Sequence, residues 1–236
     1  MLVLSGSFVT GGVAAASVAL SVPRRAAALG PPTQPLTALL AAHEAYAQPG
    51  ASAQPLELVA ARRPLTGERT VLPVLATWTS ARSARWLDVM LPGRPNGRTG
   101  WISGTATRAM NTTFAIVVDT TTRELTVYQH GRPVRTASVV VGKPSTPTPI
   151  GRFFVEEVVQ LAPKAVGAPY AFALSARSNV LQEFDGGPGQ IALHGLENVG
   201  GTPGTAVSHG CVRLTNATLA WMVTRIGPGV LVTITR

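Results

Sequence analysis

The density of glycine and proline is the feature that most constrains the fold. The 236-residue chain contains 24 glycines and 19 prolines, whereas aromatic residues make up only 6% of it. Glycine weakens helices and proline breaks them, so this composition favours short strands joined by many turns over a helical bundle. Hydrophobic residues make up 45% of the chain and charged residues 13%, which excludes an intrinsically disordered protein. We therefore predict a mainly β fold.

The lone cysteine and the basic charge narrow the chemistry. Cys211 is the single cysteine of the chain, which excludes an internal disulfide and a four-cysteine zinc site. The formal net charge is +9 and the sequence pI is about 11.2. Such a charge is compatible with nucleic acid, an anionic membrane or an acidic wall polymer. Because no basic run alternates with aromatic residues, nucleic-acid binding is not expected.

The first 23 residues carry no charge and are followed by Arg24 and Arg25. A stretch this long and apolar is able to enter a bilayer, so residues 1–28 are expected to be a signal peptide or membrane anchor. The protein is then exported to the cell envelope or wall and touches the membrane only through this segment. The basic residues that usually open a secretory signal are missing, which leaves an uncleaved anchor, an upstream start or a buried core helix as alternatives.

Residues 29–55 are predicted to be a linker, because five prolines punctuate them. A short helix over residues 37–46 fits the helical spacing of Leu36, Leu39, Leu40 and His43.

Residues 56–110 are predicted to form a small β module. Short apolar runs are separated by turn residues, including the tight-turn pair Asn96-Gly97. Residues 86–102 resemble the bacterial SH3-like modules of wall enzymes, which implies a small barrel. Residues 51–112 contain eight arginines and only three acidic residues. This charge indicates either attraction to an anionic wall polymer or an ordinary solvated surface.

Residues 113–236 carry the strongest strand pattern. Apolar and alternating runs predict an antiparallel meander, a closing strand and, before the closing strand, one short helix. The predicted strands are 114–118, 124–128, 134–141 and 230–234, and the predicted helix is 219–225, capped from residues 215–218. Three prolines make residues 142–151 a rigid loop. The glycine-containing residues 159–190 are interpreted as a long excursion over a site.

Two histidine-glycine pairs flank the lone thiol. His194-Gly195 ends an apolar run, and Ser208-His209-Gly210-Cys211 follows after a glycine-rich loop. A free thiol is mostly protonated at neutral pH, so a nucleophilic cysteine needs a nearby base, which an adjacent histidine supplies. Backbone N–H groups at Gly210-Cys211 are candidates to hold a developing oxyanion.

This motif makes residues 113–236 resemble the L,D-transpeptidase catalytic domain, the cysteine enzymes of bacterial peptidoglycan. The family pattern is a histidine followed, after a loop, by Ser/Thr-His-Gly-Cys, and residues 142–151 and the closing strand also fit. The resemblance implies a β-sandwich catalytic domain with a short helix after the cysteine motif, here preceded by the SH3-like barrel.

The resemblance also implies roles for single residues. Cys211 is the expected nucleophile and His194 the general base, whose imidazole is oriented by the backbone carbonyl of Gly195. The expected oxyanion hole and site wall are Gly210, His209, Ser208 and Gly195. Two weaker expectations concern substrate binding. Arg213 would share a face with Cys211 on extended backbone and contact a substrate carboxylate or the loop backbone, and Tyr170 would line the site or pack in the core.

By the same resemblance, Cys211 attacks the third residue of a peptidoglycan stem peptide, D-Ala leaves, and a neighbouring stem amine resolves the thioester into a 3→3 cross-link. Carbapenems are expected inhibitors, and no cofactor or metal is needed. Water or a protein lysine as acceptor would make the enzyme an L,D-carboxypeptidase or a protein-anchoring transpeptidase. Two alternatives lie outside the family. One is a non-catalytic wall-binding protein, and the other is a metal-dependent hydrolase with His194, His209 and Cys211 as ligands.

Overall fold

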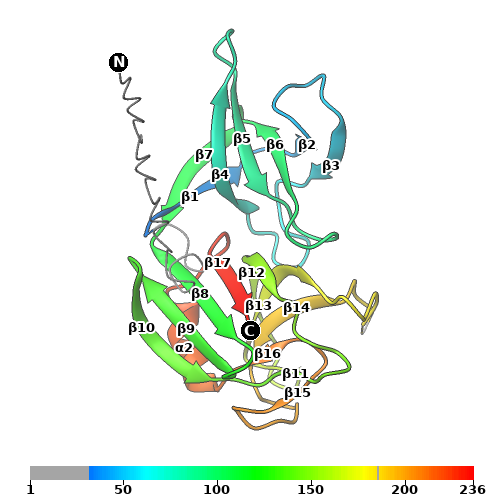
Figure 1. Ribbon diagram of the computed structural model, residues 1–236, viewed down its shortest axis with the longest axis vertical. Helices are drawn as coiled ribbons and strands as arrows, with labels where there is room; N and C mark the ends of the chain where they lie inside the picture. The colour runs from blue at the N-terminus through cyan, green and yellow to red at the C-terminus, as the bar shows by residue number, and fades with distance from the viewer. Residues whose placement is uncertain (1–31, 185) are drawn as a thin grey trace, which may run out of the picture.

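The computed structural model describes residues 32–184 and 186–236. The predicted signal peptide or anchor, residues 1–28, lies outside the described residues. Within the described part, no helix is both long and apolar enough to cross a bilayer. The chain forms two modules, one above the other in Figure 1, and each is built around its own sheet. The mainly β prediction is confirmed.

The N-terminal module is a seven-stranded sheet with the strand order β3-β2-β6-β5-β4-β1-β7. Its strands are β1 (Gln34–Leu39), β2 (His43–Tyr46), β3 (Pro55–Val59), β4 (Val71–Thr79), β5 (Arg85–Met90), β6 (Thr99–Ser103) and β7 (Thr107–Thr112). The sheet therefore begins 22 residues before the predicted start of the module at residue 56. The SH3-like character of the module stays a prediction.

The predicted linker over residues 29–55 and the helix over residues 37–46 are wrong, because β1 and β2 occupy this stretch. β1 pairs with β4 on one side and with β7 on the other. A strand with ladder hydrogen bonds along both edges outweighs a weak helical spacing of three leucines and a histidine. Leu36 and Leu39 are buried in the sheet, while Leu40 ends it at the surface.

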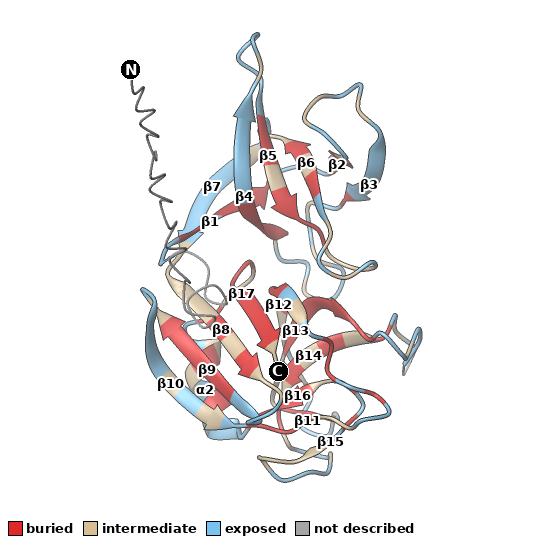
Figure 2. Cartoon of the chain, viewed as in Figure 1, coloured by how far each residue is buried: buried red, intermediate tan, exposed pale blue. Residues whose placement is uncertain are grey.

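The C-terminal module is an eight-stranded sheet with the order β10-β9-β8-β17-β12-β13-β14-β16, beside a two-stranded sheet of β11 and β15. Its strands are β8 (Phe114–Asp119), β9 (Glu124–Gln129), β10 (Arg132–Ser138), β11 (Val141–Gly142), β12 (Gly151–Gln160), β13 (Tyr170–Arg177), β14 (Gln190–His194), β15 (Ala206–Ser208), β16 (Val212–Arg213) and β17 (Leu231–Thr235). Figure 2 shows buried residues concentrated on the inner strands of this sheet, with β10 exposed at its edge.

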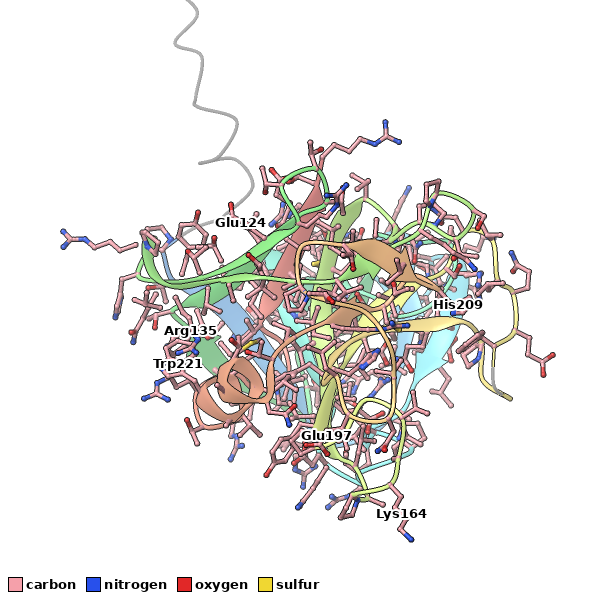
Figure 3. The ribbon with its side chains drawn as sticks, turned by 90° about the horizontal axis from the view of Figure 1, so that it is seen from below. Glu124, Arg135, Lys164, Glu197, His209 and Trp221 are labelled. Carbon is pink, nitrogen blue, oxygen red and sulfur yellow. The ribbon has the colours of Figure 1, made fainter. Side chains whose placement is uncertain are left out.

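Helix α2 (Asn216–Val223) follows the cysteine motif, as predicted. Thr215 is its N-cap, and its side chain accepts a hydrogen bond from the N–H of Thr218. The buried residues Leu219 and Met222 pack the helix against the main core. On the outer side, Trp221 lies next to Arg135 of β10, as Figure 3 shows, with the guanidinium 5.3 Å from the ring centroid.

The predicted excursion over residues 159–190 is wrong in its middle part. β12 extends to Gln160, and β13 then runs through the sheet between β12 and β14. Residues 172–178 are all buried, Ser175 and Arg177 included, so this stretch is an inner strand of the sheet and not a surface loop. Only the two loops on either side of β13, residues 161–169 and 178–189, remain available to border a site.

The two modules share a core and a buried ion cluster. Phe154 of β12 and Leu231 of β17 belong to the same buried cluster as the core of the N-terminal sheet. The side chain of Glu156, which is fully buried, pairs with Arg63 of the N-terminal module and, at 3.0 Å, with Arg177 of β13. Apolar packing and a buried ion pair therefore join the two modules in addition to the chain itself.

Candidate active site

Adjacent parallel strands bring His194 and Cys211 together. In the pairing of β14 with β16, His194 lies opposite Arg213. Side chains opposite each other share a face of the sheet, and so do residues two apart along a strand. Cys211 directly precedes β16, so it lies on the segment next to the strand that His194 ends. Sγ of Cys211 lies 4.0 Å from the carbonyl oxygen of Gln190, at the start of the strand that His194 ends.

The imidazole of His194 is held in one tautomer. Its Nδ1 lies 2.9 Å from the carbonyl oxygen of Gly195. A carbonyl only accepts hydrogen bonds, so Nδ1 carries the proton and Nε2 keeps a free lone pair. Burial lowers the pKa of His194 below its ordinary 6.5, and the Arg213 cation lowers it further, against the opposing effect of the Gly195 carbonyl. The ring is therefore neutral and competent as a base at neutral pH.

The backbone of the 161–169 loop packs behind this ring. Gly167 accepts a hydrogen bond of 2.7 Å from the N–H of Gly195, and its own N–H donates to Glu197. Gly167 has a φ of +83°, and a β-carbon there would collide with Nδ1 of His194. Only glycine combines this left-handed backbone with so close an approach to the imidazole.

Cys211 is a half-buried free thiol. Burial raises its pKa above the ordinary value, while the backbone of Ala192 and the Arg213 cation act in the opposite direction. At rest the cysteine is thus a thiol and the histidine a neutral imidazole. Such a pair needs proton transfer to the base as the sulfur attacks.

Ser208 fixes the turn that carries the thiol. Its side chain is fully buried, donates to the Cys211 carbonyl (2.6 Å) and accepts from the N–H of Gly210 (3.1 Å). The Gly210 N–H is therefore already engaged and does not serve as the predicted oxyanion donor. Gly210 has a φ of +124°, which explains why glycine precedes the cysteine. The N–H of Cys211 itself is the better candidate donor of the two.

The proline-rich loop, residues 142–150, braces this turn from the side. Thr148 accepts a hydrogen bond from the N–H of Gly142 (2.8 Å) and donates to the carbonyl of Gly210 (2.9 Å). Thr146 donates to the carbonyl of Ser208 at 3.2 Å. Both hydroxyls are buried, so the loop holds the cysteine motif through specific hydrogen bonds.

Arg213 makes one of its two predicted contacts. Its Nη1 donates to the carbonyl of Gly200, which ties the arginine to the loop backbone. The residue is 8% exposed, and its Nε has no hydrogen-bond partner among the residues that the structure describes. The predicted contact of Arg213 with a substrate carboxylate stays a prediction.

His209 and Tyr170 differ from His194 in their placement. His209 is exposed and stacks on Phe184, with ring centroids 5.5 Å apart, while Lys143 lies 3.5 Å from its Nε2. This position fits a wall residue. Ala171, the neighbour of Tyr170, lies opposite His194. Strand alternation directs Tyr170 to the other face, so the structure does not bring Tyr170 together with the thiol.

Sequence reasoning missed three residues of this site. Gly167 behind the imidazole, Thr148 beside the cysteine turn and Phe184 on His209 all reach the site from distant parts of the chain. The sole local signal was the composition of the loops, which contain glycine and proline at high density. No motif indicated which of these residues would make contact.

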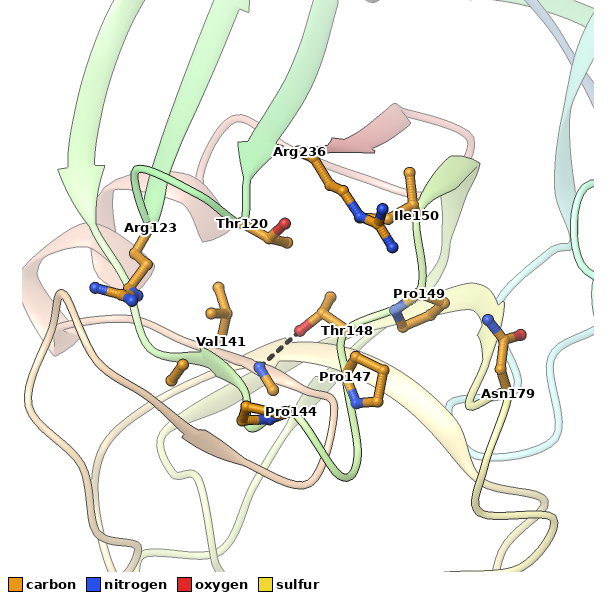
Figure 4. A pocket seen from close by; sticks show the side chains of 12 residues that line it. Thr120, Arg123, Val141, Pro144, Pro147, Thr148, Pro149, Ile150, Asn179 and Arg236 are labelled. Carbon is orange, nitrogen blue, oxygen red and sulfur yellow. Dashed lines mark hydrogen bonds between the residues drawn. The ribbon is translucent and has the colours of Figure 1, made fainter.

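A cavity of about 330 Å³ lies on the other border of the proline-rich loop (Figure 4). Its lining includes Thr148 and Pro147 of that loop together with Arg123, Asn179 and Arg236. Neither Cys211 nor His194 lines it, so we do not assign it to the reacting atoms. Among residues 32–184 and 186–236, no three histidine, cysteine, aspartate or glutamate side chains cluster as metal ligands.

Comparison with known proteins matches residues 113–234 to the YkuD family, described as the L,D-transpeptidase catalytic domain. L,D-transpeptidase 1 of Mycobacterium tuberculosis is 28% identical over 161 residues, which cover 61% of this chain and 59% of the relative. An L,D-transpeptidase structure from Mycobacterium smegmatis has a TM-score of 0.43 at 21% identity, covering 82% of this chain and 99% of that one.

L,D-transpeptidase 3 of M. tuberculosis, solved with a faropenem-derived adduct, gives a TM-score of 0.45 at 14% identity, covering 71% of this chain and 91% of that one. The family match covers just over half of the chain and includes both histidine-glycine pairs and the thiol. The chain belongs to the L,D-transpeptidase catalytic domain family.

Proposed function

We propose that this protein is an L,D-transpeptidase that cross-links peptidoglycan stem peptides through a thioester on Cys211. The observation that carries the proposal is the fixed, neutral imidazole of His194 at the end of β14, which pairs with the strand that the lone thiol directly precedes. The family match over residues 113–234 supports the same reaction class. The basic N-terminal module is compatible with an anionic wall polymer as its environment.

The first half-reaction forms the acyl-enzyme. As Sγ of Cys211 bonds to the carbonyl carbon of the third stem residue, its proton passes to Nε2 of His194. The oxygen of the tetrahedral intermediate is stabilised by the N–H of Cys211. The bond to D-Ala then breaks, and His194 returns the proton to the leaving amine.

The second half-reaction reverses these proton movements. The amine of a neighbouring stem attacks the thioester, His194 accepts its proton, and the S–C bond breaks as the new amide forms. The thiolate recovers the proton from His194, so no oxidant, metal or cofactor enters the balance. Water in place of the amine would give the L,D-carboxypeptidase reaction at the same site.

Intact-protein mass spectrometry after incubation with a carbapenem tests the proposal. We expect one covalent adduct on the wild-type protein, unchanged by a chelator, and none on Cys211→Ala, whose methyl group keeps the small apolar volume. A tetrapeptide stem substrate then identifies the acceptor, because release of D-Ala with dimer formation indicates cross-linking and release without it indicates hydrolysis. Adduct formation by Cys211→Ala, or loss of the adduct with the chelator, contradicts the cysteine mechanism.

We also propose that the protein acts outside the cytoplasm. The support is the sequence of residues 1–23, which are apolar and uncharged. Residues 1–50 fused to a reporter that is active only after export should give activity, whereas a fusion that begins at residue 32 should not. Equal activity of the two fusions contradicts the proposal.

A further inference from the structure

The loop between β13 and β14 borders the active site but is held by the other module. Residues 178–184, here called the wall segment, lead from the end of β13 to Phe184. The ring of Phe184 stacks on His209 with an interplanar angle of 29°. His209 lies two residues from Cys211, so the wall segment contacts the motif that carries the thiol. Phe184 is 50% exposed, so about half of the residue stays open to solvent despite this stacking.

Arg94 of the N-terminal module binds both arms of this loop. Its Nη2 donates to the carbonyls of Ser178 (2.8 Å) and Leu181 (3.0 Å), and its Nη1 donates to the carbonyl of Pro188 (2.7 Å). Three carbonyls from two arms of one loop thus converge on a single guanidinium. Arginine suits this task because its planar fork presents several N–H donors in fixed directions, whereas lysine offers a compact point charge.

Asn96 fixes the point at which the loop leaves the sheet. Its side-chain amide donates to the carbonyl of Arg177 and accepts from the N–H of the same residue, both at 2.8 Å. It also donates to the side chain of Asn179 at 3.1 Å. The side chain of Asn96 therefore makes a strand-like pair of hydrogen bonds with the backbone at the end of β13. Gly93 extends this pairing by donating its N–H to the carbonyl of Ser175.

The wall segment has fewer bonds of its own. Ser178 accepts hydrogen bonds from the N–H groups of Val180 and Leu181, and Phe184 pairs with Gly187. Within the C-terminal module the segment is attached by the N–H of Ser178, which donates to the carbonyl of Gly189 at 2.8 Å, and by the ring of Phe184 on His209. Arg94 and Asn96 add the hydrogen bonds that come from the N-terminal module.

We propose that Arg94 and Asn96 are positioning residues for the transpeptidase reaction, through which the N-terminal module sets one wall of the active site. This inference rests on the proposed function and assigns a role in the reaction to the N-terminal module. The wall segment then contributes to binding the stem peptide, while the thiol and its base are held independently by β14 and β16.

The test compares Arg94→Ala with Arg85→Ala, which removes the same charge from an exposed position on β5. For Arg94→Ala we expect the KM for a stem peptide to rise about tenfold, with kcat within about twofold of wild type. The midpoint of the pH profile should not move, because neither residue touches His194 or Cys211. Arg94→Lys should rescue little of the loss, and Arg85→Ala should match wild type.

Amide hydrogen exchange reports on the wall segment without any need for activity. Residues 178–184 should exchange about tenfold faster in Arg94→Ala, while residues 190–194 of β14 keep the wild-type rate. Phe184→Ala, which leaves the N-terminal module intact, provides a second route if Arg94→Ala folds poorly. It should raise KM in the same way and leave exchange at Ser178 and Leu181 unchanged.

The outcomes separate this inference from the proposed function. A wild-type protein that forms no adduct contradicts the proposed function and with it the role of Arg94 in the reaction. A wild-type protein that forms the adduct, combined with unchanged KM and unchanged exchange in Arg94→Ala, overturns the inference alone. A fall in kcat with a displaced pH profile also overturns it, because the effect would then lie in the catalytic pair.

Discussion

Two loops border the candidate active site, and they are held in different ways. The proline-rich loop is fixed by buried hydroxyls of its own module, since Thr146 and Thr148 bond the carbonyls of the cysteine turn. The loop between β13 and β14 is fixed from the neighbouring module, by Arg94 and Asn96. Groups that place the reacting atoms are therefore local to the C-terminal sheet, whereas one wall that would meet the substrate depends on the whole chain.

The largest effect is expected for the groups that the C-terminal sheet holds, and the test removes one histidine at a time. His194→Ala should slow acylation at least about 10²-fold, because general-base catalysis contributes on that order, and the acid limb of the pH profile should disappear. His209→Ala should have a smaller effect and keep the limb, because His209 is exposed and stacks on Phe184. Acylation rates against pH for both variants decide the assignment. If His209→Ala moves the limb and His194→Ala does not, the two roles are reversed.

Gly167→Ala is expected to have the next largest effect. A β-carbon would displace the imidazole from behind and would strain a left-handed backbone. An ångström of misplacement at a reacting group is able to cost on the order of 10²-fold, so acylation should fall by about that factor or somewhat less. Gly186→Ala, at a similar φ of +73° but with open space around it, is the matched control. Equal losses in both variants would mean that backbone strain, and not contact with His194, is responsible.

Thr148→Val tests the brace on the cysteine turn. Valine keeps the shape but loses both hydrogen bonds, so stability should fall by about 1–3 kcal/mol. The acylation rate should fall by about tenfold through kcat, in contrast to the KM effect expected for Arg94→Ala. Thr122→Val, at an exposed turn, serves as the control for chemical denaturation and kinetics. A pure KM effect of Thr148→Val would remove the contrast between the two loops.

Arg213→Gln should give the smallest change, which is a shift in pH dependence. The arginine cation lowers the pKa of both His194 and Cys211. Acylation falls as the imidazole becomes protonated, so without the cation the acid limb should move to higher pH. Arg225→Gln, on the outer side of α2, should leave the limb in place. An acid limb that moves to lower pH in Arg213→Gln contradicts this electrostatic role.

The sequence predicted those strands and that helix whose periodicity or capping residues lie within the element itself. The strands near residues 114–128 and a helix after the cysteine motif follow from periodicity and capping, and the structure has both, although the helix begins at Asn216 and not at the predicted residue 219. β13 was missed because it is buried on both faces, so its polar residues Ser175 and Arg177 do not mark a solvent-facing side. β1 was missed because its pairing with β4 and β7 depends on residues far along the chain.

In the candidate site, too, the reacting groups could be predicted from the sequence and the residues that support them could not. The motif around Cys211 and His194 identified the reacting groups, because their chemistry demands those residue types near one another. The support around them was not predictable, since Gly167, Thr148 and Arg94 act through contacts with residues distant in sequence. Asn96 was correctly read as a turn residue, but nothing in the turn indicates that its amide pairs with β13.

The buried pairing of Glu156 with Arg63 has a consequence for how the protein denatures. Cutting the chain before residue 113 would leave Glu156 without one cationic partner and would uncover Phe154 and Leu231, which lie in the shared core. Loss of one partner from a buried ion pair typically costs about 3–5 kcal/mol, a large share of the stability of a domain. The family boundary at residue 113 is thus no boundary of cooperative unfolding, and the intact chain should melt in a single calorimetric transition.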